Sequence, residues 1–290
     1  MQDKLNSESW IFYPKKILNI KEHIEQIGTP LEDLKVKIKF GIKTGYNKAF
    51  IINEKIKNKL IKKDQKSKEI IKPILRGRDI NRYHISFKNL YLILSKSGVR
   101  IDKEYPEIYK HLKKFEDKLK KRWDKGKYWF NLRECSYYEE FEKPKIVWQE
   151  IVRDPNFAYD KSGFYCEATT FIMIGKNLRY IIGILNSKPG AFFFKNFYAG
   201  GGLGGSGYRY KKAFLKQLPI PKIISKNKNI KNEIEKNVEN IIDITKDNDY
   251  SKNEEKQKKV KKIQEKIDRI IYELYDLSKE EIKIIEESFK

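Results

Sequence analysis

Polar side chains that suit a phosphate- or base-bearing ligand gather around two glycines in the first fifth of the chain. The glycines are Gly41 and Gly45, and the polar residues among and after them are Lys43, Thr44, Tyr46, Asn47 and Lys48. Glycine lets backbone amides approach a ligand closely, lysine and threonine contact phosphates, and asparagine and tyrosine bind or stack on bases. The segment predicts a nucleic-acid contact, and the alternative is a hairpin turn with ordinary polar residues.

A second segment surrounds one glycine, Gly77, with arginines. Arg76, Arg78 and Arg82 lie close together in sequence, and Tyr83 follows the last of them. The planar guanidinium group pairs bidentately with guanine or phosphate, so we expect these residues to contact a nucleic acid. Asp79, within the same segment, either orients one arginine or neutralises it as a surface ion pair.

The third segment is a glycine-rich stretch over residues 200–207. It contains a literal G-x-G-x-x-G, but no β-branched strand precedes it and no helix signal begins at its last glycine, which argues against a dinucleotide site. The Lys-Ser/Thr pair of a P-loop is also missing. We expect a loop that becomes ordered over a backbone phosphate, and a disordered linker is the alternative for the glycines alone. The expected contact residues are Gly202, Gly205, Tyr208, Arg209, Lys211 and Lys212.

The overall charge agrees with a polyanionic partner. The chain has 63 Lys and Arg against 40 Asp and Glu, a net charge of +23 over 290 residues. A genome rich in A·T pairs would also raise the lysine content, but glutamate usually rises with it, so a surplus this large still favours a polyanion. Aromatic residues make up 13% of the chain and often adjoin basic ones, a pattern that suits nucleic acid better than a lipid surface.

Several other classes of protein are not supported. The two cysteines and three histidines are scattered without metal-ligand spacing, so we expect no metal site and two reduced thiols in a cytoplasmic protein. No segment resembles a signal peptide, and no apolar run approaches the roughly 18 residues of a membrane span.

One tetrapeptide, Asp154-Pro155-Asn156-Phe157, resembles the Asp/Asn-Pro-Pro-Tyr/Phe signature of amino-group methyltransferases. Its second proline is absent, and so is an upstream glycine-rich cofactor motif between a strand and a helix. Short acid-x-lysine triplets occur, as in nucleases, but chance explains them in a chain this rich in charge. We therefore expect no catalytic residues and a tight loop at 154–157.

Hydrophobic periodicity predicts an α+β fold that positions these segments. Isoleucines at helical spacing predict a helix ending at Gly28, and further helices are expected from Pro106 and over 178–187. Strands are expected at 35–40, 48–52, 90–94, 145–151 and 170–174. After Pro221 two long polar helices carry narrow apolar stripes, and Ser278 with Glu281 predicts a capping box that begins a last helix. The expected division is an N-terminal helix and linker over 1–34, a recognition domain over 35–222 and a helical hairpin over 223–290.

These segments, in this order, resemble the TaqI-like C-terminal specificity domain of type IIG restriction-modification proteins and adenine-specific DNA methyltransferases. The similarity covers nearly the whole chain, and each of its motifs is weak alone whereas the ordered set is specific. The motifs lie at residues 41–50, 73–80, 143–146, 185–188, 215–221, 267–275 and 280–282.

The resemblance implies a mixed α/β target-recognition domain for double-stranded DNA, with helices that fix its distance from the rest of the enzyme. In that family the methyltransferase, and the nuclease where there is one, lie N-terminal to this domain. Because the chain lacks their motifs, it looks like a fragment or a separate specificity subunit that is no enzyme on its own. S-adenosylmethionine is then expected on the missing methyltransferase part rather than here.

Two other functions stay open at this point. One is a phosphate- or nucleotide-utilising enzyme built on the 200–207 loop. The other is a protein that binds RNA or single strands and uses its aromatic residues as stacking platforms.

Overall fold

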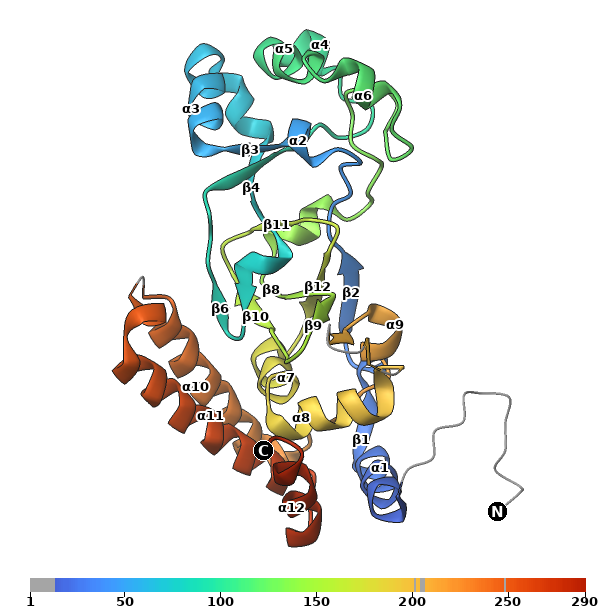
Figure 1. Cartoon of the computed structure of the whole chain (residues 1–290), viewed down its shortest axis with the longest axis vertical. Coiled ribbons are helices and arrows are strands. Elements are labelled where there is room, and N and C mark those ends of the chain that lie inside the picture. The colour runs from blue at the N-terminus through green and yellow to red at the C-terminus, as the bar shows by residue number, and fades with distance from the viewer. Residues whose placement is uncertain (1–13, 201, 204–206, 248) are drawn as a thin grey trace, which may run out of the picture.

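A four-stranded antiparallel sheet at the centre of the molecule separates two hydrophobic cores (Figure 1). The structure is a computed structural model, and it describes residues 14–200, 202–203, 207–247 and 249–290. The central strands, in the order β10-β8-β12-β2, are β2 (Val36–Phe40), β8 (Lys145–Gln149), β10 (Ala158–Asp160) and β12 (Thr170–Gly175).

Alternation along these strands divides the side chains between the two cores. Trp148 and Phe171 belong to one core, which we call the lower core after its place in Figure 1. Val147 and Ile172 belong to the other, which we call the upper core. Both faces of β8 and β12 are therefore buried, which explains why their sequences are continuous apolar runs.

A second sheet and a group of short helices, in the upper part of Figure 1, supply most residues of the upper core. Its strands, in the order β11-β4-β7-β3, are β3 (Ile51–Asn53), β4 (Ile71–Leu75), β7 (Leu90–Ile93) and β11 (Tyr165–Cys166). Its helices are α2 (Asn47–Phe50), α3 (Glu54–Lys63), α4 (Ile101–Glu104), α5 (Pro106–Lys113) and α6 (Glu116–Lys120).

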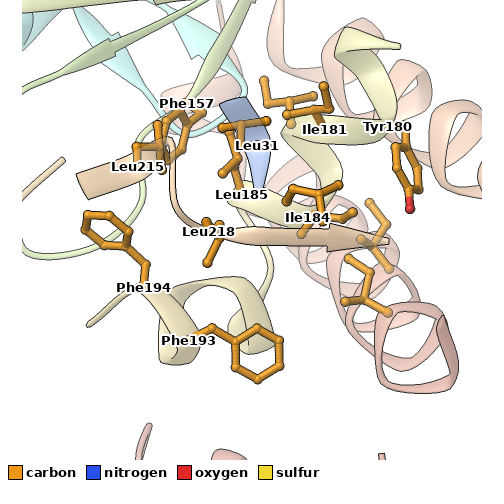
Figure 2. Packing of buried hydrophobic residues seen from close by; sticks show 14 of the residues in the cluster. Leu31, Phe157, Tyr180, Ile181, Ile184, Leu185, Phe193, Phe194, Leu215 and Leu218 are labelled. Carbon is orange, nitrogen blue, oxygen red and sulfur yellow. The ribbon is translucent and has the colours of Figure 1, made fainter. Parts of the chain in front are cut away.

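The lower core is mainly helical, and Figure 2 shows how its aromatic and aliphatic side chains pack. Its helices are α1 (Lys15–Ile27), α7 (Leu178–Leu185), α8 (Lys188–Phe193), α9 (Lys212–Leu215), α10 (Lys228–Thr245), α11 (Glu254–Leu274) and α12 (Lys279–Glu287). Three small antiparallel pairs complete the fold: β1 (Gly28–Pro30) with β14 (Pro219–Pro221), β5 (Ile80–Asn81) with β6 (His84–Ile85), and β9 (Ile151–Val152) with β13 (Tyr208–Arg209).

The C-terminal helices share the lower core rather than form one of their own. Ile234 of α10 lies so close to α7 that a Cβ atom at Gly183 would be 2.6 Å from its Cγ2 atom. The Tyr275 hydroxyl donates a hydrogen bond of 2.5 Å to the carbonyl of Pro219. The isoleucine stripes of α10 and α11 are thus largely buried against the rest of this chain.

The α+β class predicted from the sequence is confirmed, and most long elements lie where periodicity places them. Two local predictions were wrong. Residues 48–52 were expected to be one strand, but α2 occupies the first half and β3 the second. The helix from Pro106 ends at Lys113, and a separate helix begins after Phe115. In the described part of the chain no helix is long and apolar enough to cross a membrane.

Candidate nucleic-acid interface

The three segments singled out by sequence meet at one end of the central sheet. At this end β2 finishes at Phe40, β12 begins at Thr170 and β8 finishes at Gln149, as the strand register shows. The amide of Gly41 donates to the carbonyl of Thr170 at 2.9 Å. A Cβ atom at Gly41 would lie 1.9 Å from the carbonyl oxygen of Glu167, so a crossing of two backbone segments, and not the approach of a ligand, requires this glycine.

The first segment turns on a buried threonine. Thr44 is 2% exposed, its hydroxyl donates to the Asn47 side chain, and it accepts a hydrogen bond of 3.2 Å from the Tyr46 amide. Thr44 therefore shapes the loop and does not face a ligand, which corrects its expected role in contacting DNA. Asn47 donates onward to the carboxylate of Glu167 at 3.3 Å, while Lys43 and Lys48 extend into solvent.

A buried arginine that the sequence reasoning missed anchors this loop. The Arg122 guanidinium donates to the backbone carbonyls of Thr44, Trp129 (2.7 Å) and Asn131 (2.9 Å). It also lies 4.7 Å from the ring centroid of Phe50. Desolvation lowers the pKa of Arg122 to about 10, so the guanidinium stays charged at neutral pH. The side chain ties the first segment to the loop that follows α6.

In the second segment, the side chain of Arg76 is held in an ion pair, whereas that of Arg78 is exposed. Arg76 forms a two-point ion pair with Asp79, and this hydrogen bonding raises the pKa of Arg76. Gly77 lies against the side chain of Gln149, which brings the segment to the end of β8. Arg78 is exposed and forms no ion pair in the described part of the chain.

Arg82 and Tyr83, the last two residues of the second segment, lie toward α10, α11 and the lower core rather than beside Gln149. Tyr83 is 4% exposed and belongs to the lower core, and its carbonyl accepts a hydrogen bond of 3.0 Å from the Thr245 hydroxyl of α10. Burial raises the pKa of its phenol. Tyr83 is thus a core residue, which corrects its expected contact with DNA. The exposed Arg82 donates to the carbonyl of Asn186, and with Lys188 it borders a hollow of about 330 Å³ beside α11.

The third segment adjoins the second through the residues after β8. Tyr208 and Arg209 form β13, which pairs with Val152 and Ile151 of β9. The amide of Tyr210 then donates to the carbonyl of Glu150 at 2.7 Å.

The remaining predicted residues of this segment lie beside that pairing. Lys211 lies 3.9 Å from the Glu150 carboxylate. The exposed Lys212 borders a hollow of about 260 Å³ together with Lys37 and Lys39 of β2. Gly202 is exposed, and Gly205 lies outside the described residues.

We call these parts together the candidate interface, defined as residues 41–48, 76–79, 149–152, 167–170 and 208–212. Its middle carries hydrogen-bonding side chains that the sequence reasoning did not select, namely those of Gln149, Glu150 and Glu167. It also carries the exposed cations of Lys43, Arg78 and Lys212, which form no ion pair among the described residues. Acceptors and amides in the middle can bind base edges, and the cations around them can contact phosphates.

The described residues of this interface form neither a metal site nor a reactive thiol. Among the described residues, no group of histidine, cysteine, aspartate and glutamate side chains could hold a metal ion. Cys166 is buried, and desolvation raises its pKa to about 12, so its thiol is unreactive at neutral pH. A hollow of about 410 Å³ next to Lys43 is lined partly by the exposed ring of Phe40 and by Tyr137.

Comparison with models of known families identifies one family. The sequence model of the family described as the TaqI-like C-terminal specificity domain matches residues 72–220. The type II methyltransferase M.MjaIV of Methanocaldococcus jannaschii is 27% identical over 232 residues, which is 74% of this chain and 75% of that protein. The type II methyltransferase M.BstVI of Geobacillus stearothermophilus is 22% identical over 295 residues, 98% of this chain and 47% of that protein.

Two solved structures share the fold. The type IIL restriction-modification enzyme MmeI, solved in complex with DNA, gives a TM-score of 0.65 at 15% identity, over 89% of this chain and 36% of that one. The type IIG restriction endonuclease BpuSI gives a TM-score of 0.50 at 14% identity, over 91% of this chain and 34% of that one. The chain thus spans most of the first methyltransferase, about half of the second, and about a third of each enzyme of known structure.

Proposed function

Because this chain belongs to the TaqI-like C-terminal specificity domain family, we propose that it recognises a specific sequence in duplex DNA for an adenine-N6 methyltransferase. The observation that carries the proposal is the meeting of three cation-bearing segments around Gln149, Glu150 and Glu167 at one end of the central sheet. Each segment comes from a different part of the sequence, so the fold itself brings them together.

The arrangement supports a division between residues that position the DNA through its phosphates and residues that read its bases. Lys43, Arg78 and Lys212 carry exposed charges, so we assign them to phosphates. Arg76 is oriented by Asp79 through Nε and Nη2, which leaves donors on Nη1 for a base edge. Gln149 suits adenine, because a side-chain amide bonds to its N6 and N7 atoms, and the carboxylates suit the amino group of cytosine.

The same proposal assigns catalysis to another part of the enzyme. Methyl transfer, and cleavage where it occurs, would belong to a methyltransferase or nuclease domain or subunit that holds S-adenosylmethionine. The chain alone would then select the site without modifying it, in the cytoplasm where the DNA is. Its similarity to 47% of M.BstVI supports this assignment, whereas the match to 75% of M.MjaIV leaves less of that protein for a separate catalytic part.

Selection from a pool of random duplexes by the full chain tests the proposal. We expect one short sequence to be enriched, and we expect single strands of that sequence to compete poorly. Tighter binding of the single strands or of RNA would contradict duplex recognition. Incubating the chain with labelled S-adenosylmethionine and the selected duplex, with a complete methyltransferase as positive control, should leave the DNA unmethylated.

A further inference from the structure

One aromatic side chain lies almost entirely in solvent. Trp123, in the loop after α6, is 99% exposed, whereas Trp129 is half-buried and Trp148 is buried. An indole is a large apolar group that normally gains stability from burial, with its N–H bonded to a partner. Full exposure leaves the whole ring available to another molecule.

The loop holds Trp123 outward. The preceding residue, Arg122, is buried and bonded to three carbonyls from two separate segments, as described above. The carbonyl of Trp123 itself accepts a hydrogen bond of 3.0 Å from the amide of Lys125. With one neighbour anchored and its own carbonyl bonded in a turn, the backbone that carries the indole is held in place.

This place adjoins the candidate interface. Gly45, in the left-handed conformation with φ of 66°, lies 3.0 Å from Arg122 Cδ and 3.3 Å from the carbonyl oxygen of Asp124, measured from a Cβ atom built on the glycine. The first segment and the Trp123 loop therefore pack directly on each other. A ligand bound at the first segment therefore lies next to the loop that carries Trp123.

Charge indicates the kind of partner. The exposed residues near Trp123 in the sequence are mostly cationic, and they include Lys118, Lys121, Lys125 and Lys127. Asp124 is already paired with Arg133 at 3.2 Å. Among the described residues, no other large exposed apolar side chain lies between Phe40 and Leu203. A protein-docking patch needs contiguous apolar surface, whereas a single aromatic ring among lysines matches the stacked bases of a polyanion.

We propose that Trp123 inserts at a base step of the duplex at the border of the recognised site and stacks on a base there. The inference rests on the proposed function and adds a contact that deforms the DNA. Apolar side chains inserted between base pairs unstack them, and pyrimidine–purine steps yield most easily. Trp123 would thus add a preference for a flexible step next to the sequence read by the candidate interface.

Binding of a short mixed-sequence duplex by the full chain tests this, with two readouts. The emission of Trp123 is isolated as the difference between the parent spectrum and that of Trp123→Phe, and we expect the duplex to quench it and shield it from acrylamide. Trp123→Ala should weaken binding by roughly 5- to 140-fold, which is about 1–3 kcal/mol at about 1.4 kcal/mol per tenfold. Trp123→Phe should recover most of that loss.

The salt dependence separates stacking from charge. Because indole is neutral, Trp123→Ala should leave the slope of log affinity against log salt unchanged. Lys121→Ala, a charge variant at an exposed position in the same loop, should reduce that slope by up to about 0.9.

Three outcomes would contradict the insertion of Trp123, and the measurements distinguish them. If the parent binds the duplex but Trp123 emission is unaffected and Trp123→Ala binds as tightly, the insertion is wrong and the proposed function stands. The insertion is equally wrong if Trp123→Ala abolishes self-association instead of DNA affinity, because the residue then docks protein. If the parent binds no duplex, the proposed function fails and the insertion with it.

Discussion

The guanidinium group of Arg76 is held by both carboxylate oxygens of Asp79, at 3.0 Å from Nε to Oδ2 and 2.8 Å from Nη2 to Oδ1. Asp79 is 1% exposed and also accepts the Arg76 amide at 2.9 Å. Arg78, two residues along the chain, has no such partner in the described part of the chain. Two arginines that look equivalent in the sequence therefore have different roles.

Substituting each arginine by alanine should separate these roles. Arg76→Ala leaves a buried carboxylate with fewer partners, so we predict a loss of about 1–3 kcal/mol in the free energy of unfolding, together with weaker discrimination at one base pair. Arg78→Ala should change stability by less than about 0.5 kcal/mol and weaken binding to all duplexes alike. Urea unfolding and anisotropy titrations measure both effects. Equal destabilisation by the two variants would contradict the assignment.

A buried ion pair away from the candidate interface should dominate the stability of the sheet. Lys145 of β8 and Asp160 of β10 are both inaccessible, and the ammonium group also donates to the carbonyl of Phe141. Removing one partner of such a pair costs about 3–5 kcal/mol, because the other charge remains buried, and we predict this loss for Lys145→Met. Lys143→Met, at an exposed position just before β8, should be close to neutral in the same urea titration. A neutral result for Lys145→Met would mean that water reaches Asp160.

Burial of His111 should make the protein less stable in mild acid. His111 is buried and its Nε2 donates to the carbonyl of Ala49 at 3.1 Å, and desolvation lowers its pKa below the ordinary value of 6.5. The unfolded chain then binds the proton more readily, so stability is full above about pH 6.5 and falls as the pH drops below it.

The matched variants are His111→Gln, which removes the titrating group, and Lys113→Gln, which removes an exposed neighbouring charge. Between about pH 7.5 and pH 5.5 the parent and Lys113→Gln should lose stability by the same amount, and His111→Gln should lose less. An identical loss in all three proteins would show that His111 does not contribute.

The C-terminal helices should be required for folding. Ile267 of α11 is fully buried in the lower core, so Ile267→Asp places a carboxylate among apolar side chains. We predict an unfolded or aggregated protein by circular dichroism and size-exclusion chromatography. Ile224→Asp is the matched control because Ile224 is 57% exposed, and it should fold normally. A folded, monomeric Ile267→Asp would mean that α11 is detachable.

Local sequence patterns predicted those parts of the fold that depend on neighbours along the chain. The stripes of α10 and α11 and the Ser278 capping box are set by residues within a few turns, and the structure confirms them. The exact extent of short elements such as α2 depends on packing under the upper sheet, which periodicity does not contain.

The candidate interface was only partly visible in the sequence, because long-range pairing creates it. Glu167 joins it through a bridge between residues 42 and 167, and nothing in its local sequence distinguishes it. Arg122 looked like any other basic residue in the sequence, because its burial depends on carbonyls from two distant segments. Tyr83 looked like part of an arginine-rich surface loop and instead packs in the lower core. Burial of a polar residue is decided by distant elements, so composition alone could not assign it.

The most direct test compares two triple variants of equal charge over a salt series with the selected duplex. One replaces Lys43, Arg78 and Lys212 of the candidate interface by alanine, and the other replaces Lys236, Lys259 and Lys262 of α10 and α11. All six side chains are exposed, and none forms an ion pair in the described part of the chain. Phosphate contacts should reduce the slope of log affinity against log salt by about 0.9 each, so we predict a fall of about 2.7 for the first variant and almost none for the second. Equal reductions of the slope would show that binding follows net charge alone. A larger reduction in the helical variant would place the DNA on α10 and α11 instead of the candidate interface.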